Sequence, residues 1–366
     1  MNDLPDPKSN PELLGHQEAE RQLLDGWNSE RLAHAWLISG PRGIGKATLA
    51  YRFARFALAG GGEGGGLFGG GPENLAISPE HPVFRRVVSG GHADLKIIER
   101  GLTDKGKRRG EIVVDDVRDV GHFLSLTPAE GGWRVVVVDA ADEMNRSAAN
   151  ALLKVLEEPP PRALLLLVCH APGRLLPTIR SRCRRLEMKP LSEADTVKLV
   201  TRAHPELGFD EAETLARLAE GSAGRAIALA EEGGLTLYRE VMKLLSTLPD
   251  LDITALHAFG ERLGKAGAED AFRTGGELLT DWLARMVRAG GRGELPKETV
   301  PGEAETTRRL LSAASLDRWV EVWEKSRRVL AKAETAHLDR KQAVLVVFSS
   351  IGRAAAGRPE PIGGRL

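Results

Sequence analysis

Short apolar runs alternate with segments of helical periodicity along the first half of the chain. Unbroken apolar runs predict strands that are buried on both faces of a parallel sheet, and they occupy residues 35–39, 133–138 and 163–168; residues 111–114 and 184–188 predict two further short strands. Amphipathic or apolar segments between them predict helices, at residues 46–58, 116–126 and 147–158. Strands that alternate with helices predict a doubly wound α/β domain with a ligand site at the carboxyl ends of the strands.

Strand signals end after Pro190, and the remaining pattern is helical. Residues 192–195 and 210–213 resemble capping boxes, which open helices, so the segment to about residue 232 predicts a small helical bundle. Four later segments have helical periodicity, at residues 237–245, 271–288, 316–332 and 340–355. They predict a third, all-helical domain, whose core we expect to include Trp282, Trp319 and Trp323.

Composition describes an ordinary globular protein of 366 residues, 42% hydrophobic and 28% charged. Basic and acidic residues both number 51, which argues against a polybasic nucleic-acid binder but leaves a local basic face open. The only cysteines, Cys169 and Cys183, are too few for a disulfide scaffold or a four-thiolate zinc site. The chain shows neither a secretion signal nor an apolar run of about 20 residues, so we expect a cytoplasmic protein without membrane contact.

Three segments have the composition of loops. Residues 60–71 are rich in glycine and predict a flexible surface insertion. Residues 103–110 predict a solvated hairpin turn; their cations, Lys105, Lys107, Arg108 and Arg109, leave contact with nucleic acid as an alternative. The Gly/Pro-rich end, residues 357–366, predicts a disordered tail.

A glycine-rich loop follows the first predicted strand and leads into a helix. Its sequence, Gly40-Pro-Arg-Gly43-Ile-Gly45-Lys46-Ala47, has the form of a phosphate-binding loop. Backbone N–H groups of such a loop wrap a phosphate, and the helix N-terminus favours negative charge. The position after Lys46 normally supplies a hydroxyl to Mg²⁺, but here it is Ala47. Thr48 comes one residue late, which turns a helical side chain by about 100°.

The second half of a P-loop ATPase site is four apolar residues, an aspartate and usually a glutamate. Here the strand at 135–138 leads to Asp139, which stands where the aspartate that holds Mg²⁺ through water would stand. The next position, where a glutamate would orient the attacking water, is Ala140. Alanine can neither accept a proton nor orient water. A shifted base at Asp142 or Glu143 remains a disfavoured alternative.

Longer motifs resemble one family, the delta-prime subunits of the bacterial DNA polymerase III clamp loader, which are AAA+ proteins. The resembling segments lie at residues 34–41, 139–160, 179–183, 221–225 and 338–342. Asp139-Ala140 in place of Asp-Glu is similar to delta-prime rather than to the hydrolysing gamma/tau subunits. The resemblance implies an AAA+ domain at 1–189, a helical lid at 190–234, and an all-helical collar at 235–356, before the tail at 357–366.

The resemblance also assigns roles to residues. It implies that Arg182, in a Ser-Arg-Cys motif, is an arginine finger that reaches the ATP site of a neighbouring subunit. Arg225 takes the place of the sensor-2 arginine, and His170 stands where active relatives have a small polar sensor-1 residue. Many related subunits carry a four-cysteine zinc insert. This chain has only His81 and His92 in that stretch, too few ligands for a structural zinc ion, so we expect no metal there.

The functional hypothesis is a non-hydrolysing structural (stator) subunit of the clamp loader. It would help load the sliding clamp onto primed DNA, with gamma/tau and delta subunits as partners and primer–template DNA reached through the complex. The retained Gly40, Gly43, Gly45 and Lys46 predict weak binding of ATP or ADP without hydrolysis. The alternative is a hydrolysing AAA+ subunit of the gamma/tau type.

Overall fold

The computed structural model describes residues 6–29, 31–61, 71–103, 106–130, 132–335 and 339–358. Most of the glycine-rich segment, Lys105, Leu338 and residues 359–366 of the predicted tail lie outside the described residues. The chain forms two compact units; one comprises Met1–Pro205 and Glu220–Arg225, and the other comprises Glu206–Ala219 and Ala226–Leu366. This division falls inside the segment predicted as a lid, and the boundaries at 189 and 234 stay predictions.

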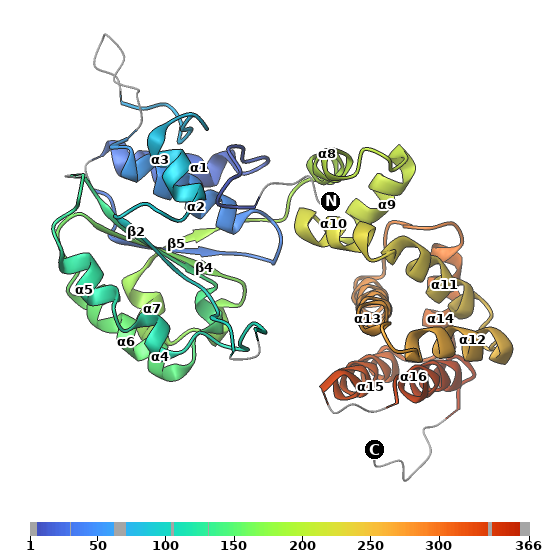
Figure 1. The fold of residues 1–366 in the computed structure, drawn as a ribbon. Coiled ribbons are helices and arrows are strands. Elements are labelled where there is room, and N and C mark those ends of the chain that lie inside the picture. Colours follow the sequence, from blue (N-terminus) through green and yellow to red (C-terminus); the bar gives the residue numbers. More distant parts are fainter. Residues whose placement is uncertain are drawn as a thin grey trace. The chain divides into compact units, whose positions relative to one another are not determined.

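The first unit contains a five-stranded parallel sheet in the order β2-β3-β4-β1-β5 (Figure 1). The strands are β1 (Ala35–Ser39), β2 (Leu95–Ile98), β3 (Arg134–Asp139), β4 (Ala163–Cys169) and β5 (Arg184–Glu187). Four of them confirm the strands predicted from apolar runs. The first strand in the chain, β1, thus lies between the last two strands of the sequence, and the loop after β1 leaves the sheet one strand in from the β5 edge.

Helices cover both faces of this sheet (Figure 1). One layer contains α1 (Gln17–Asn28), α2 (Lys46–Leu58) and α3 (Pro82–Val88). The other contains α4 (Val114–Val117), α5 (Val120–Ser125), α6 (Arg146–Glu157) and α7 (Pro177–Arg182), and α8 (Glu193–Ala203) follows the sheet. Trp36 and Ile38 of β1 point into the first layer, whereas Ala35 and Leu37 point into the second. Helices cover β1, β3 and β4 on both faces, which is why the sequences of these three strands are almost continuously apolar.

Two sequence predictions in this unit are wrong. Residues 111–114 form no strand; Ile112 makes only an isolated bridge to Met144. The Asp116 carboxylate accepts the Val113 N–H at 2.9 Å and so closes a helical turn, which starts α4 at Val114. The single helix predicted at 116–126 is two short helices, α4 and α5. The edge strand β2 went unpredicted because three of its four residues are only half-buried.

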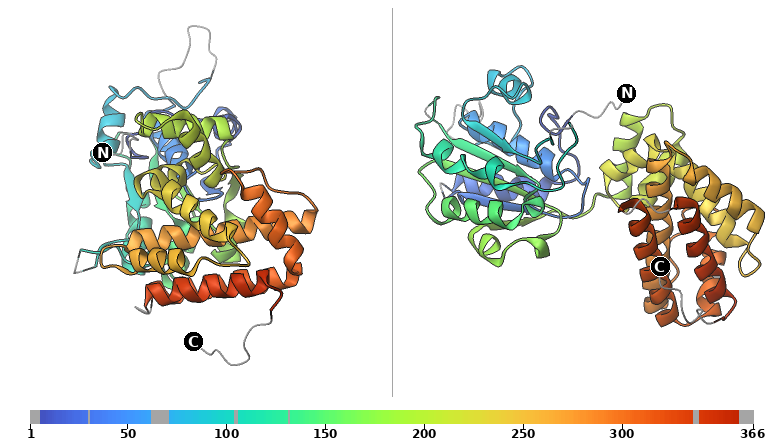
Figure 2. Two further views of the ribbon diagram at one scale, coloured as in Figure 1. Left: turned by 90° about the vertical axis from the view of Figure 1, so that its right-hand side faces the viewer. Right: turned by 60° about the horizontal axis from the view of Figure 1, so that its bottom comes forward.

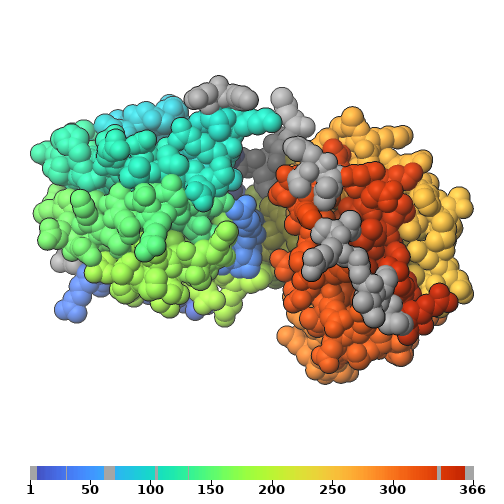
Figure 3. Space-filling model, turned by 90° about the horizontal axis from the view of Figure 1, so that it is seen from below, coloured from blue at the N-terminus to red at the C-terminus, as the bar shows by residue number. Residues whose placement is uncertain are grey.

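The second unit is all-helical. It contains α9 (Phe209–Leu218), most of α10 (Ala223–Glu231), α11 (Gly234–Ser246), α12 (Ile253–Gly264), α13 (Glu269–Arg292), α14 (Glu303–Ala313), α15 (Leu316–Thr335) and α16 (Arg340–Ala355). Long α15 and α16 lie side by side (Figure 2). Residues of the C-terminal helices form most of the face of this unit that the space-filling view presents (Figure 3).

The four helices predicted here are confirmed, but α12 and α14 were missed. Trp282 and Trp319 are core residues as predicted, with exposed fractions of 1% and 0%. The prediction for Trp323 is wrong, because it is only half-buried and stacks under the Arg327 guanidinium, 5.0 Å from the ring centroid. Asp210 does not cap α9; Gly208 is the cap, and Asp210 lies in the first turn.

A buried polar network joins three helices of this unit. Glu303, which is 1% exposed, accepts a hydrogen bond from the Tyr238 hydroxyl at 2.7 Å and another from the Thr299 N–H at 2.7 Å. The Arg285 guanidinium lies 3.5 Å from the same carboxylate. Buried carboxylates are tolerated only when they are paired and hydrogen-bonded, so this network fixes how α11, α13 and α14 pack.

Candidate nucleotide site

The phosphate loop connects β1 to α2 as the sequence predicted. Gly45 is the N-cap of α2, with φ of 101°. Gly43 has φ of 72°, a left-handed conformation that favours glycine, and a Cβ there would lie 2.4 Å from the Ser222 hydroxyl. At Gly40 a Cβ would lie 2.4 Å from the Met188 carbonyl oxygen. Glycine is therefore needed at Gly40 and Gly43 because the loop packs closely against Met188 and Ser222.

The predicted sensor-2 segment packs directly on the outside of this loop. The Ser222 hydroxyl donates to the Arg42 carbonyl oxygen at 2.8 Å, and the Gly224 N–H donates to the Gly43 carbonyl oxygen at 2.8 Å. The Arg225 N–H donates to the Ser222 hydroxyl at 3.2 Å, which places Arg225 at the start of α10 beside the loop. Two carbonyl oxygens of the loop thus accept hydrogen bonds from this segment.

The N-terminal segment supports the same loop from another side. The His16 ring, 6% exposed, contacts the Ile44 carbonyl oxygen through Nε2 at 2.6 Å. Burial lowers the pKa of His16, although the contact with Ile44 opposes this. A neutral imidazole with a protonated Nε2 fits the carbonyl acceptor. Sequence reasoning missed His16, and no local motif points to it.

Lys46 is buried, at 3% exposure, and its ammonium donates to the Pro41 carbonyl oxygen within the loop. Burial lowers its pKa to about 8, against the nearby charges of Asp139 and Asp142. Ala47 packs against the apolar layer formed with α1 and α3. Thr48 is buried, at 9% exposure, and lies one residue further along α2 than Ala47.

Asp139 ends β3 and is half-buried. Burial raises the pKa of its carboxyl, with Glu143 and Glu99 adding to the rise and Lys46 opposing it. Ala140, where an active ATPase needs a glutamate, is 2% exposed. The strand end therefore holds one carboxylate that suits a cation and no carboxylate in the position of a general base.

The Asp142 carboxylate has a structural role. Its two carboxylate oxygens accept the N–H groups of His170 at 2.8 Å and Ala171 at 3.1 Å, and so fix the segment after β4. Burial alone would raise the pKa of Asp142, but the His170 hydrogen bond and other interactions bring it below its usual value. This carboxylate is thus a poor proton acceptor at neutral pH.

Glu143 is engaged by two cations. Its carboxylate contacts the guanidinium of Arg42, in the loop, and lies 2.8 Å from Nε of Arg100. The Glu143 side chain is only 13% exposed, whereas that of Arg42 is 66% exposed. Both residues that could replace the missing base, Asp142 and Glu143, are therefore already bound by other groups of the same chain.

His170, at the predicted sensor-1 position, is uncharged at neutral pH. Burial, together with the charges of Lys46 and Arg42, lowers its pKa to about 4. Its Nδ1 is buried and has no hydrogen-bond partner among the described residues. A neutral imidazole beside two cations can offer a lone pair or an N–H group, but it adds no positive charge for a phosphate.

Arg182 is the last residue of α7, and its contacts are with α6 and α7. Its Nη2 lies 2.8 Å from the Glu157 carboxylate, and its Nη1 donates to the Thr178 carbonyl oxygen at 3.1 Å. The side chain remains 35% exposed. The structure therefore groups the predicted Gly40, Gly43, Gly45, Lys46, Asp139 and Arg225 around or beside one loop, and presents Arg182 separately on the surface of the unit.

The described residues contain no cluster of three or more His, Cys, Asp or Glu side chains that could hold a metal ion. His81 instead caps α3 by accepting the Val83 N–H, and His92 accepts the Asp94 N–H. In the same part of the chain, none of the helices combines the length and apolar character that crossing a membrane requires.

The parallel sheet between two helical layers, with a glycine loop entering α2, defines an AAA+ P-loop domain followed by an all-helical part. Residues 15–192 match the family model described as "DNA polymerase III, delta subunit". DNA polymerase III subunit delta' of Pseudomonas aeruginosa is 37% identical over 190 residues, which cover 52% of this chain and 53% of that protein. Through this segment the chain is similar to DNA polymerase III clamp-loader subunits, and in particular to the delta-prime type.

Other clamp-loader subunits are more distantly similar. The tau subunit of Bacillus subtilis is 23% identical over 97% of this chain and 64% of its own length, and that of Escherichia coli is 28% identical over 78% and 43%. The chain thus spans about half the length of the delta-prime relative and at most 64% of these tau relatives. A gamma subunit-related protein from Thermotoga maritima, 19% identical, has a TM-score of 0.37 over 91% of this chain and 99% of its own.

Proposed function

We propose that the chain is a non-hydrolysing structural subunit, a stator, of the DNA polymerase III clamp loader. One observation carries the proposal: among the described residues, the three positions that follow the end of β3 and could supply a base offer no free carboxylate. Ala140 replaces the usual glutamate, Asp142 accepts two backbone N–H groups, and Glu143 is paired with Arg42 and Arg100. A general base must be able to reach and accept the proton of the attacking water, and each of these side chains fails that requirement.

Magnesium binding is weakened in the same site. Ala47 offers no oxygen where the loop normally holds Mg²⁺, and the Thr48 hydroxyl is buried one position further along α2. Asp139 alone remains, and burial disfavours its charged form. Since Mg²⁺ bridges the β- and γ-phosphates and neutralises their charge in P-loop enzymes, its weak retention lowers both ATP affinity and any residual turnover.

The loop nonetheless keeps the geometry of a phosphate cradle. Its outward carbonyls are satisfied by Ser222 and Gly224, and Lys46 lies within it. We therefore infer weak binding of ATP or ADP as a structural ligand, through Gly40, Gly43, Gly45 and Lys46. Arg225 is positioned beside the loop, where its guanidinium would face the same nucleotide.

Arg182 would act on a different molecule. An arginine supplied in trans neutralises charge on the transferred phosphoryl group of a neighbouring ATPase subunit. Its partially exposed side chain contacts Glu157 and Thr178, and this supports the role because both contacts lie on the surface of the unit. The partners in this proposal are gamma/tau and delta subunits, with the sliding clamp and primer–template DNA reached through the complex, in the cytoplasm.

The proposal is tested by measuring ATP hydrolysis with the purified chain and with the reconstituted clamp loader. We expect the chain alone to show no turnover above that of its Lys46→Ala variant. We also expect the complex to load clamp onto primed DNA only when the chain is present. Turnover by the chain alone at the rate of gamma/tau, lost in Lys46→Ala, would rule out the stator role.

The second candidate is a hydrolysing subunit of the gamma/tau type. Similarity to the B. subtilis tau subunit along 97% of this chain favours it. It requires the Thr48 hydroxyl to bind Mg²⁺ in place of the missing loop hydroxyl. It also requires the carboxylate of Asp142 or Glu143 to break its present hydrogen bonds or ion pairs and act as the general base. Single-turnover hydrolysis with Mg²⁺ distinguishes the two candidates, since only this one predicts formation of ADP that either Asp142→Asn or Glu143→Gln abolishes.

A further inference from the structure

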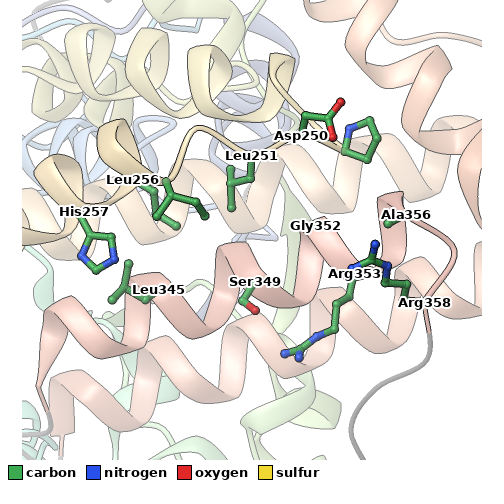
Figure 4. A pocket seen from close by; sticks show the side chains of 12 residues that line it. Asp250, Leu251, Leu256, His257, Leu345, Ser349, Gly352, Arg353, Ala356 and Arg358 are labelled. Atoms are coloured by element: carbon green, nitrogen blue, oxygen red, sulfur yellow. The ribbon is translucent and has the colours of Figure 1, made fainter.

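The second unit contains a groove between the α11–α12 connection, α12 and the C-terminal half of α16 (Figure 4). Its volume is about 650 Å³, in the range of sites that hold a compact ligand or a few peptide side chains. Leu251, Leu256 and Leu345 face one another across it. Neither the nucleotide site nor the arginine finger uses any residue of this groove.

The apolar part of the groove is open to solvent. Ile253, on its rim, is 57% exposed, one of the most exposed large aliphatic residues in the described part of the chain. Leu251 and Leu345 are half-buried on opposite walls. A concave apolar surface that is not filled by the chain's own side chains is the usual form of a site that receives side chains of a partner.

The polar part of the groove is basic. Arg353 and Arg358 lie at one end and His257 at the other, against a single carboxylate, Asp250, among the lining residues. The Nε of Arg353 is buried and donates to no acceptor within the described residues. Within the same part of the chain, neither guanidinium has a carboxylate within 4.0 Å, whereas Arg340 and Lys341 on the first turn of α16 are both paired.

We propose that this groove binds a short acidic and aliphatic peptide segment of a protein partner. Aliphatic side chains of the segment pack on Leu251, Ile253 and Leu345, and a carboxylate of the segment pairs with Arg353 and Arg358. Guanidinium groups bind carboxylates through paired, charge-assisted hydrogen bonds. The inference goes beyond the proposed stator role and does not depend on it.

The chemistry of the lining favours a peptide over a nucleic acid. Single-stranded nucleic acids are bound by basic grooves in which aromatic side chains stack on bases. The lining residues of this groove include two arginines but no Phe, Tyr or Trp. Aliphatic walls with a cationic end instead complement a segment in which leucine or isoleucine residues are followed by aspartate or glutamate.

The test uses the full chain and three fluorescein-labelled nine-residue peptides, read by fluorescence anisotropy. One peptide combines leucines with aspartates and glutamates, the second replaces the acidic residues by lysine, and the third replaces the leucines by serine. We expect saturable binding of the first peptide only. Arg353→Glu should weaken it at least tenfold, and Ser349→Trp, which fills the groove, should abolish it.

Matched controls separate the groove from general charge effects. Arg308→Glu makes the same charge change on the exposed face of α14 and should leave the affinity unaltered. Arg353→Gln removes the charge but keeps a polar side chain, so it tests the charge if the reversal unfolds the protein. Thermal unfolding of each variant establishes that it is folded.

Five results would overturn the proposal. Four of them are equal binding of the lysine peptide, unchanged binding in folded Arg353→Gln, no saturable binding of the acidic peptide at millimolar concentration, and tighter binding after truncation at residue 358. Tighter binding after the truncation would make residues 359–366 of the chain itself the occupant. Concentration-dependent dimerisation that Arg353→Gln abolishes would instead make the occupant a second copy, and would equally contradict a heterologous partner.

Discussion

Arg182 and Glu157 form an ion pair, with Nη2 of the arginine 2.8 Å from the glutamate carboxylate. The two side chains are 35% and 48% exposed. Ion pairs at such exposure contribute about 0–1 kcal/mol. The pair therefore orients Arg182 along the surface of α6 without holding it there, and a stronger anion, such as a triphosphate on a neighbouring subunit, can displace Glu157 at little cost.

Replacing Arg182 by alanine should lower ATP hydrolysis of the assembled clamp loader while leaving assembly intact. A trans arginine contributes about 10³-fold or more at the site that it serves, so we expect at least a tenfold loss in the complex. The measurement is steady-state ATPase of the reconstituted complex, with size-exclusion chromatography to verify its composition. A complex with normal turnover would remove the finger role from Arg182.

Glu157→Gln is the matched variant for the same pair. It removes the partner of Arg182 but leaves the guanidinium in place. We expect the complex to hydrolyse ATP as fast as the wild type or faster, because the released arginine needs no displacement. If Glu157→Gln instead reduced turnover as much as Arg182→Ala, the ion pair itself, rather than a free arginine, would be the functional element.

Nucleotide affinity should rise when Glu143 is neutralised. Glu143→Gln removes the carboxylate that pairs with Arg42 in the loop, so the guanidinium becomes available to phosphate. Arg42 is 66% exposed and Glu143 is 13% exposed, and the gain expected from releasing a pair that is partly open to solvent is about 1 kcal/mol, roughly fivefold in Kd. Equilibrium binding of labelled ADP measures it. Glu130→Gln, which breaks the surface pair with Arg86, is the control and should leave Kd unaltered.

Restoring a hydroxyl to the loop should restore dependence on magnesium. Ala47→Ser places an oxygen at the position that normally holds Mg²⁺. We expect ATP to bind at least about tenfold more tightly with Mg²⁺ than with EDTA in this variant, and nearly equally in the wild type. Hydrolysis should stay absent, because Ala140 is unaltered. A strong increase in ATP affinity on adding Mg²⁺ to the wild type would contradict the proposal that this site binds Mg²⁺ weakly.

Stability should fall as the pH drops from 6.5 towards 4. The pKa of His170 in the folded chain is about 4, below its ordinary value of 6.5. Between these values the unfolded chain binds a proton that the folded chain does not, so stability is full above pH 6.5 and is lost below it. His16 and His92, whose pKa values are also lowered by burial, act in the same direction.

Chemical denaturation at several pH values measures this dependence. One proton corresponds to at most about 1.4 kcal/mol per pH unit. His170→Gln should flatten the profile between pH 6.5 and 4, whereas substitution of the exposed His257 by glutamine should not. An identical slope in His170→Gln and the wild type would show that His170 does not titrate in this way.

The buried Glu303 network should dominate the stability of the helical unit. Tyr238→Phe removes one donor to Glu303 and leaves the Arg285 guanidinium without its 2.8 Å acceptor, at an expected cost of about 1–3 kcal/mol. Glu303→Ala removes the counter-charge of Arg285, whose side chain is only 13% exposed, at an expected cost of about 3 kcal/mol. Glu305→Ala, exposed on the same helix, is the control, and urea unfolding is the measurement. Equal losses in all three variants would contradict the network.

Elements with unbroken patterns could be predicted from the sequence. The buried strands β1, β3 and β4 and helices α2, α6 and α16 lie within one or two residues of their predicted bounds, because an apolar run or a helical period depends on local residues alone. The edge strand β2 and the turn that replaced the strand at 111–114 could not be predicted. The first depends on pairing with β3, and the second depends on a side-chain contact between Asp116 and Val113.

The sequence alone determined which chemical groups the site lacks, since Ala47 and Ala140 can supply neither a metal ligand nor a base in any fold. It left open whether Asp142 or Glu143 could stand in for them. Only the tertiary structure decided that, because the partners of these carboxylates come from distant parts of the chain: His170 and Ala171 after β4, and Arg42 and Arg100 from two loops. Whether a carboxylate is free to act as a base depends on the residues that the fold places next to it, and a local sequence pattern does not contain that information.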